Sequence, residues 1–274
     1  MGDNVKSKAI LKYPGGKWKI SDWIISHFPE HRVYLEPFFG SGAVFFRKEP
    51  AYIETINDID DEIVNLFRVC REKPQELATA VNLTPFARSE FLSCAESSSD
   101  PIEQARRTLV RYHQSIGTNN SKGNSWKNVQ VAGGPRCDTM WNYLPEAICQ
   151  CCERLKNAQI ENTDALRLIE RYNSDDVLIY CDPPYLPDVL TTTKAVYGAE
   201  LSLEKHRELL QILKESKAKV VLSGYDNELY NSELADWEAD EIQTNIQQGL
   251  IRTEKIWYNF RRQQISLFGL EKIR

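Results

Sequence analysis

A short, wholly apolar run that ends in two prolines is the starting point for the fold of this chain. Residues 177–181 read VLIYC, and Asp182, Pro183, Pro184 and Tyr185 follow at once. An apolar run of this length with such a boundary is typical of a buried strand. In open α/β sheets, ligands bind beyond the carboxyl ends of the strands. We therefore expect a binding site at residues 182–185.

Strands and helices alternate over much of the sequence. The expected strands cover residues 32–38, 52–56, 177–181, 219–222 and 252–260. The expected helices cover about 60–70, 164–172 and 202–216, and a further one is expected to follow the tight turn at 40–42. Acidic residues at 60 and 61 and Ser202 are well placed to begin two of these helices. Such alternation predicts a doubly wound α/β fold with a mixed sheet.

The alternation is interrupted between residues 74 and 145. Helical stretches such as 100–116 lead into GTNNSKGNSWKNVQVAGGPR at 117–136, which is rich in Gly, Asn and Ser. A loop this long inside a compact domain is usually functional or mobile. We therefore predict one domain formed by 1–73 and 146–274, and an inserted, mainly helical and loop-like subdomain at 74–145.

The net charge of −5 at pH 7 argues against a polyanionic partner, but the charge is unevenly distributed. The stretch from Gln104 to Cys137 holds no Asp or Glu, and its basic residues are Arg106, Arg107, Arg111, Lys122, Lys127 and Arg136. Local patches decide where a polyanion binds. Composition alone leaves a nucleic-acid contact and a solvated surface loop about equally open. The position of the stretch within the insert favours the contact.

The cysteines and the hydropathy place this chain in a broad class. Seven cysteines in a chain without the apolar stretch of a secretory signal predict free thiols in a cytoplasmic protein. Cys149, Cys151 and Cys152 lie in a helical pattern, and no histidine follows at zinc-site spacing, so we expect no metal. No apolar run approaches the ~20 residues that span a bilayer.

The sequence DPPY suits the recognition of an amino group. Two prolines fix the backbone and remove two amide donors, so that carbonyl oxygens face outward. The Asp182 carboxylate and the Pro183 carbonyl can each accept one hydrogen from an exocyclic amine, and Tyr185 can stack on its ring. Such an amine could attack an electrophilic methyl group, with catalysis by orientation and electrostatics. The competing interpretation is a proline-rich turn after a strand.

Two further strand ends carry polar or glycine-rich motifs. In EPFFGSG (36–42), the glycines allow a ligand to approach the backbone, and the expected helix would present its N-terminus. A G-x-G pair alone is a weak signal, since about half of such turns are plain connections. Asp58, after the next expected strand, can bind ribose hydroxyls or cap a helix. The two motifs together favour ribose binding.

The segment KYPGGK (12–17) is a basic, aromatic turn before the first strand. It lacks the G-x-x-x-x-G-K-[ST] pattern of a phosphate loop, and Trp18 follows the lysine, so nucleoside triphosphate binding is excluded. Lys17 can hold a carboxylate. Taken in isolation, the segment is only a surface turn.

These segments, in this order, resemble the Dam-like family, the α-group of DNA adenine-N6 methyltransferases. The matching segments are KYPGGK (12–17), LEPFFGSGAVFF (35–46), NDID (57–60), NTDAL (162–166) and YCDPPY (180–185). The resemblance spans about the whole chain. It implies a Rossmann-like methyltransferase fold, S-adenosyl-L-methionine as the cofactor, and transfer of a methyl group to an adenine flipped out of double-stranded DNA.

The resemblance also implies roles for individual residues. The cofactor-binding residues would be Tyr13, Lys17, Glu36, Phe38, Gly40, Gly42, Asp58, Asp164 and Asp182. Lys17 would lie near the cofactor carboxylate, Asp58 at the ribose and Asp164 at the adenine. Asp182, Pro183 and Tyr185 would form the pocket for the target adenine. Residues 74–145 would be the target-recognition subdomain, with Arg111, Asn119, Asn120, Lys122, Asn124, Trp126 and Lys127 as the DNA-binding candidates.

The insert departs from the members of the family that read GATC. It carries YHQSIGTNNSKGNSWKN (112–128), nearer to phage-like members. The recognition sequence and the oligomeric state stay open. A bacterial or phage origin is implied, with a cognate restriction endonuclease as a candidate partner. The alternatives are an RNA adenine methyltransferase and a non-catalytic DNA-binding protein, and the intact Asp182, Tyr185, Asp58 and Lys17 argue against the latter.

Overall fold

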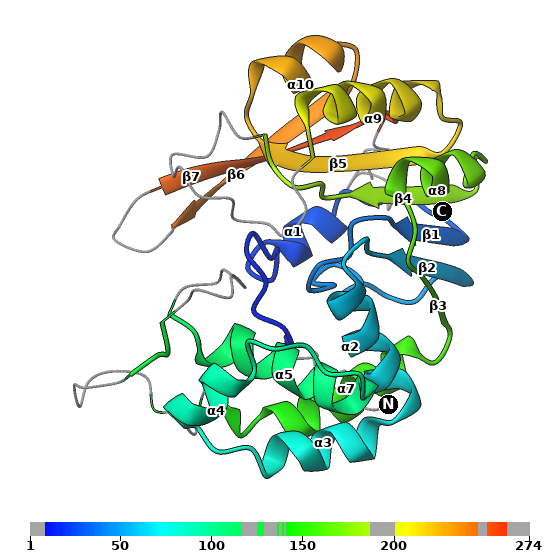
Figure 1. The fold of residues 1–274 in the computed structure, drawn as a ribbon. Coiled ribbons are helices and arrows are strands. Elements are labelled where there is room, and N and C mark those ends of the chain that lie inside the picture. The colour runs from blue at the N-terminus through cyan, green and yellow to red at the C-terminus, as the bar shows by residue number, and fades with distance from the viewer. Residues whose placement is uncertain are drawn as a thin grey trace, which may run out of the picture.

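A computed structural model of the chain shows a central sheet flanked by helices (Figure 1). The structure describes residues 9–116, 125–128, 136, 139, 141–186, 201–245 and 251–261. Within these residues, seven strands form one sheet in the order β3-β2-β1-β4-β5-β7-β6. This arrangement confirms the mixed α/β fold expected from the sequence.

The five strands on one side of the sheet are parallel, and the last two are antiparallel. The parallel strands are β1 (Val33–Glu36), β2 (Ile53–Asn57), β3 (Ala158–Glu161), β4 (Val177–Cys181) and β5 (Lys219–Tyr225). The antiparallel pair is β6 (Glu238–Asn245) and β7 (Ile251–Tyr258), with β7 beside β5. β1 pairs with β2 on one side and with β4 on the other. The strand order reverses there, which is where open sheets bind ligands.

Helices cover both faces of this sheet (Figure 1). The group on one face comprises α8 (Ala165–Arg171), α9 (Leu203–Glu215) and α10 (Glu228–Glu233). The second group begins with α1 (Ser21–Ile25) and α2 (Asp61–Glu72) on the other face, and it continues with α3 (Pro74–Asn82), α4 (Arg88–Ser93), α5 (Pro101–Gln114) and α7 (Leu144–Leu155), which pack around α2 and one another. β4 is buried along its whole length. Leu178 and Tyr180 join the core under the second group, and Ile179 and Cys181 join the core under the first. This two-sided burial explains why its sequence is apolar throughout.

Four helices begin directly after a side chain that caps their first turn. The side chains of Asp60, Asp100, Asp164 and Ser202 each accept a hydrogen bond from a backbone amide in the first turn of α2, α5, α8 and α9. Such N-caps satisfy amides that have no partner within the helix. The expected strands agree with β1, β2, β4, β5 and β7 to within a few residues at each end.

The prediction of a helix after Gly42 is wrong. Residues 43–48 form turns, with single helix-like bonds such as the one from the Phe46 amide to the Gly42 carbonyl, 2.9 Å long. No N-terminus of a regular helix therefore faces the glycine turn in the described structure. Two strands were also missed. β3 is a short edge strand, and β6 carries three acidic residues, which is unusual for a strand.

The helices at 74–114 and α7 lie together below the sheet edge in the view of Figure 1. α3 packs against α7, and α5 packs against α2. α7 begins at Leu144 and runs across the expected boundary at 145, so it bridges the two expected units. The division into domains stays a prediction.

The six cysteines that the structure describes are free thiols. Among the described helices, none is long and apolar enough to cross a membrane. No cluster of His, Cys, Asp or Glu suited to a metal ion occurs in the described part of the chain.

Candidate active site

A cavity of about 260 Å³ opens at the carboxyl ends of β1, β2 and β4. Its walls come from the KYPGGK turn, the strand ends at 36–41 and 58–60, the start of α8, and the DPPY segment. The cavity brings together all the cofactor-binding and catalytic candidates except Gly42, namely Tyr13, Lys17, Glu36, Phe38, Gly40, Asp58, Asp164, Asp182, Pro183 and Tyr185. The sequence motifs therefore converge on one site, although the role of each residue stays a prediction.

Lys17 is the centre of a buried ionic cluster. Its Nζ lies 2.9 Å from Asp182 Oδ1 and 3.8 Å from Glu254 Oε2. It also donates hydrogen bonds to the Gly15 carbonyl, at 3.0 Å, and to the Tyr185 hydroxyl. Burial favours the neutral amine, but the charges of Asp182 and Glu254 outweigh burial and raise the pKa of Lys17. Lys17 is therefore a cation that already holds a carboxylate of the protein itself.

The described residues bind the Asp182 carboxylate through one oxygen. Lys17 and the Ser223 hydroxyl both contact Oδ1, the latter at 2.9 Å from β5. Oδ2 has no hydrogen-bond partner among the described residues. The side chain is 20% exposed and lines the cavity. Asp182 is thus fixed in position, and no described residue occupies its second acceptor atom.

Tyr185 is held between two elements of the structure. Its ring packs on Tyr225 with centroids 4.3 Å apart and planes at 46°. Its hydroxyl donates to Glu254 Oε2 at 3.1 Å while it accepts from Lys17. The residue is buried. A base that stacks on the Tyr185 ring would have to use the face that Tyr225 does not cover, or displace the Tyr225 ring. Stacking therefore stays a prediction.

Asp58 holds the glycine turn as well as lining the cavity. Its two carboxylate oxygens accept hydrogen bonds from the amides of Gly40 (2.8 Å) and Asp60 (3.0 Å). Burial raises the pKa of Asp58 to about 6, although these backbone bonds favour the charged form. Each oxygen has a further lone pair, so binding of ribose hydroxyls is compatible with these bonds.

Asn57 connects the strand ends that form the cavity, and sequence reasoning gave it no role. Its amide nitrogen donates to the carbonyls of Pro37 (2.9 Å) and Thr163 (3.1 Å), and its oxygen accepts from the Thr163 amide at 2.9 Å. A fully buried amide thereby joins the loops that follow β1, β2 and β3. The motif NDID contains this asparagine, but only the fold shows which strand ends it connects.

Ile59 is a second residue that the sequence did not single out. It lines the cavity beside Asp58 and is 56% exposed. Phe38 and Leu166 also line the cavity. Large apolar side chains at a cavity wall are suited to cover an aromatic ring of a ligand.

Glu36 lies deep in the site. It is buried, and the Tyr34 hydroxyl donates a hydrogen bond to its Oε2 at 2.6 Å. Burial raises the pKa of Glu36 to about 8, the Tyr34 bond opposes the rise, and the negative charge of Asp182 adds to it. Glu36 is therefore mainly protonated at pH 7.

The structure places Gly42 in a packing role. Its φ is +64°, and a Cβ atom there would lie 2.4 Å from Phe39 Cζ and 2.7 Å from Phe46 Cε2. It does not contribute to the cavity wall. Gly40, with φ of +49°, does line the cavity, and a Cβ atom there would meet the ring of Tyr13.

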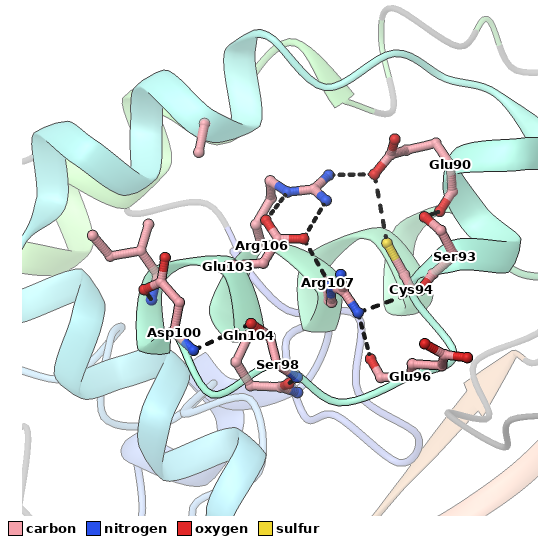
Figure 2. A network of polar contacts seen from close by, with 12 residues as sticks. Glu90, Ser93, Cys94, Glu96, Ser98, Asp100, Glu103, Gln104, Arg106 and Arg107 are labelled. Carbon is pink, nitrogen blue, oxygen red and sulfur yellow. Dashed lines mark hydrogen bonds and ion pairs between the residues drawn. The ribbon is translucent and has the colours of Figure 1, made fainter.

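Three of the basic residues of the acid-free stretch are paired with acids from outside it. The buried Arg111 donates to Glu62 of α2 and to Thr108. Arg106 binds both oxygens of Glu103 at 2.7 Å and Glu90 at 2.6 Å, and Arg107 binds Glu103 at 2.7 Å (Figure 2). These arginines connect helices, and their charges are neutralised within the protein.

Trp126 and Lys127 belong to a short segment fixed to the end of α5. The amides of Ile116 and Lys127 donate to the carbonyls of Ser125 and Gln114 at 2.8 and 2.7 Å. The Trp126 ring packs near Phe86, with centroids 5.8 Å apart, and beneath Arg88. Asn119, Asn120, Lys122 and Asn124 lie outside the described residues.

The start of the described chain connects this segment with the cavity. His113 of α5 contacts the Ile10 carbonyl through Nε2 at 2.9 Å, and Tyr13 stacks on Tyr112 with centroids 5.9 Å apart. Burial and the nearby charge of Lys127 lower the pKa of Lys12. Two lysines, one from the KYPGGK turn and one from the insert, are thus brought together near the cavity.

Comparison with known proteins shows where similar sequences occur. A family model described as D12 class N6 adenine-specific DNA methyltransferase matches residues 13–247. The chain is 27% identical to a DNA adenine methylase of Haemophilus influenzae, over 98% of this chain and 96% of that protein. It is 29% identical to a DNA adenine methylase of Escherichia coli K12, over 82% of this chain and 83% of that protein.

Proposed function

Because this chain belongs to the D12 class of N6 adenine-specific DNA methyltransferases, we propose that it methylates the N6 amine of adenine in double-stranded DNA with S-adenosyl-L-methionine as the donor. The observation that carries this proposal is the state of Asp182. Its Oδ1 is fixed by Lys17 and Ser223, and its Oδ2 has no partner among the described residues. The free oxygen and the adjacent Pro183 carbonyl are two acceptors suited to the two hydrogens of an exocyclic amine.

The side chains around the cavity fit the proposed cofactor in their chemistry. Asp58 is suited to the ribose hydroxyls, and Ile59 and Leu166 to the faces of an adenine ring, with Asp164 at its edge. Glu36 and Asp182 are suited to the ammonium and sulfonium charges. Lys17 is suited to a carboxylate, although Asp182 and Glu254 already hold it. When bound, the cofactor supplies an electrophilic methyl group on a positively charged sulfur.

The residues of the chain then act by orientation and charge. Methyl transfer would use the lone pair of the N6 amine for the new N–C bond, leave the electron pair of the C–S bond on sulfur, and release one proton from the nitrogen. Asp182 would hold the amine, stabilise the positive charge that develops on it, and accept this proton. An adenine within a duplex has its amine engaged in pairing, so the base must be flipped out.

The proposal is tested by incubating the purified protein with labelled S-adenosylmethionine and unmodified duplex DNA, followed by analysis of the nucleosides. We expect label in N6-methyladenine. Parallel reactions with single-stranded RNA and without nucleic acid identify the substrate. Label only in RNA adenine, or in no nucleoside, would contradict the proposal.

We further propose that the segment at 125–128 contacts DNA phosphates. Lys127 lies close enough to Lys12 for their charges to oppose each other, and an anion between them would relieve this repulsion. Lys127→Ala should weaken binding to all duplexes and lower the slope of log affinity against log salt by roughly one unit. Titration of labelled duplexes of different sequence over a range of salt concentrations measures both effects.

Lys214→Ala provides the control for this variant. Lys214 lies on α9, on the opposite face of the sheet, and pairs with Glu233. It should leave the affinity and the salt slope as in the wild type. Equal slopes for the wild type and Lys127→Ala would show that Lys127 makes no phosphate contact.

Binding of the proposed cofactor should release a proton from Glu36. With its pKa raised to about 8, Glu36 is mainly protonated at pH 7 in the free protein. A cationic ligand favours the carboxylate and lowers this pKa, so affinity should rise with pH up to about 8. Calorimetry in buffers of different ionisation enthalpy, between about pH 6.5 and 7.5, measures the proton released. Glu36→Gln should release fewer protons, and equal release by both proteins would refute this assignment.

A further inference from the structure

Glu254 is an acidic residue that does not line the cavity itself but contacts Lys17 and Tyr185, which do, and no sequence motif points to it. It lies on the antiparallel strand β7, opposite Tyr225 of β5. Its side chain is 12% exposed, and its Oε2 lies 3.1 Å from the Tyr185 hydroxyl and 3.8 Å from Lys17 Nζ. The charges that act on it come from Lys17, Asp182 and Arg252, and Arg252 is itself bound to the Tyr225 hydroxyl at 2.8 Å.

Glu254 determines the charge balance around Lys17. The groups in contact are one ammonium, on Lys17, and two carboxylates, on Asp182 and Glu254. In the free protein, Glu36 adds little negative charge at pH 7, because burial raises its pKa to about 8. These three groups carry one net negative charge with Glu254 and none without it, and the charge of Arg252, which also acts on Glu254, offsets part of that difference. Without Glu254, Lys17 would neutralise Asp182 alone.

We propose that Glu254 supplies the negative charge by which the site prefers the sulfonium cofactor to its demethylated product. This inference rests on the proposed methyl transfer, in which a positively charged sulfur becomes a neutral thioether. A carboxylate beside the cavity attracts the first form and loses that attraction when the methyl group has left. Glu254 would also neutralise part of the Lys17 charge. The negative charge of Asp182 would then be less compensated by Lys17 and could stabilise the reacting amine. Glu254 is in this sense a positioning residue.

A purely structural role for Glu254 makes a different prediction. Burial raises the pKa of Glu254, which means that its charged form is disfavoured by its surroundings, while Lys17 and the Tyr185 hydroxyl oppose this effect. Glutamine keeps the shape and can still accept the bond from Tyr185. If the Glu254 charge serves the cofactor, Glu254→Gln should cost little folding stability. If Glu254 instead forms a structural ion pair with Lys17, the same substitution should destabilise the fold.

The test measures the affinities for S-adenosylmethionine and S-adenosylhomocysteine by calorimetry. In Glu254→Gln, we expect the preference for the charged ligand to fall about tenfold, as the loss of one partly screened charge implies. The melting temperature should stay near that of the wild type. Glu254→Asp, which keeps the charge, should retain more of the preference than Glu254→Gln does.

Glu241→Gln is the matched control. Glu241 lies on the same hairpin, opposite Lys255, and is exposed. It should change neither affinity. An unchanged preference in Glu254→Gln, or a loss of folding stability with both ligands weakened alike, would overturn the inference. The proposed function is judged separately, because it fails if the wild type forms no N6-methyladenine, whatever the two affinities show.

Discussion

Asp182→Asn should lower the rate of N6-methyladenine formation by about a thousandfold, the upper range for the loss of one preorganised charged group. Asparagine has nearly the same shape and can still accept from Ser223, so the fold should persist. Its amide nitrogen, however, can take the place of the free Oδ2 and present donors to an amine that also donates. The charge that would stabilise the reacting nitrogen is lost as well. Single-turnover measurement of labelled N6-methyladenine separates this effect from slow product release.

Asp226→Asn is a close control for this variant. Asp226 directly follows β5, as Asp182 directly follows the neighbouring strand β4, and both bind a lysine at short distance. Asp226 is 55% exposed, however, and lies outside the cavity wall. Its substitution should leave the rate within about twofold, as expected for a surface ion pair. Equal rates for the wild type and Asp182→Asn would show that the pocket is assigned to the wrong residues.

The parts of this molecule that could be predicted from sequence are those whose causes are local. The apolar run at 177–181 and the residues that cap α2, α5, α8 and α9 depend on neighbours within a few positions. The motifs at 12–17, 36–40 and 182–185 meet because parallel strands end at one edge of the sheet. The rule for where such sheets bind ligands was therefore sufficient to expect one shared site.

The parts that could not be predicted depend on contacts between distant segments. Glu254 enters the site because β7 runs antiparallel beside β5, and nothing near it in the sequence marks this. Nothing near Lys17 in the sequence marks its contact with Asp182, while its expected role toward a cofactor carboxylate stays a prediction. The arginines of the acid-free stretch looked like a free positive patch. A window along the sequence cannot show that Glu62 and Glu90 lie beside them.

Gly42→Ala should destabilise the fold by about 2–5 kcal/mol, a large share of the ~5–15 kcal/mol that holds a typical protein folded. Two costs add up at this position. The φ of +64° is unfavourable for any residue with a Cβ atom, by about 1–2 kcal/mol. The new methyl group would also meet the rings of Phe39 and Phe46, at 2.4 and 2.7 Å, in a packed cluster with Phe45 and Phe67, and such overpacking costs about 1–3 kcal/mol.

Two other glycines separate this packing effect from an effect on the site. Gly224→Ala on β5 should be nearly neutral, because its φ is ordinary and the nearest atom to a new Cβ would be 3.5 Å away. Gly40→Ala should weaken cofactor binding as well as stability, since Gly40 lines the cavity and a Cβ atom would press on Tyr13 at 3.0 Å. Urea unfolding and cofactor titration of the three variants give both quantities. If Gly42→Ala unfolds at the same urea concentration as Gly224→Ala, the glycine turn is not held in this conformation by the packing of its neighbouring phenylalanines.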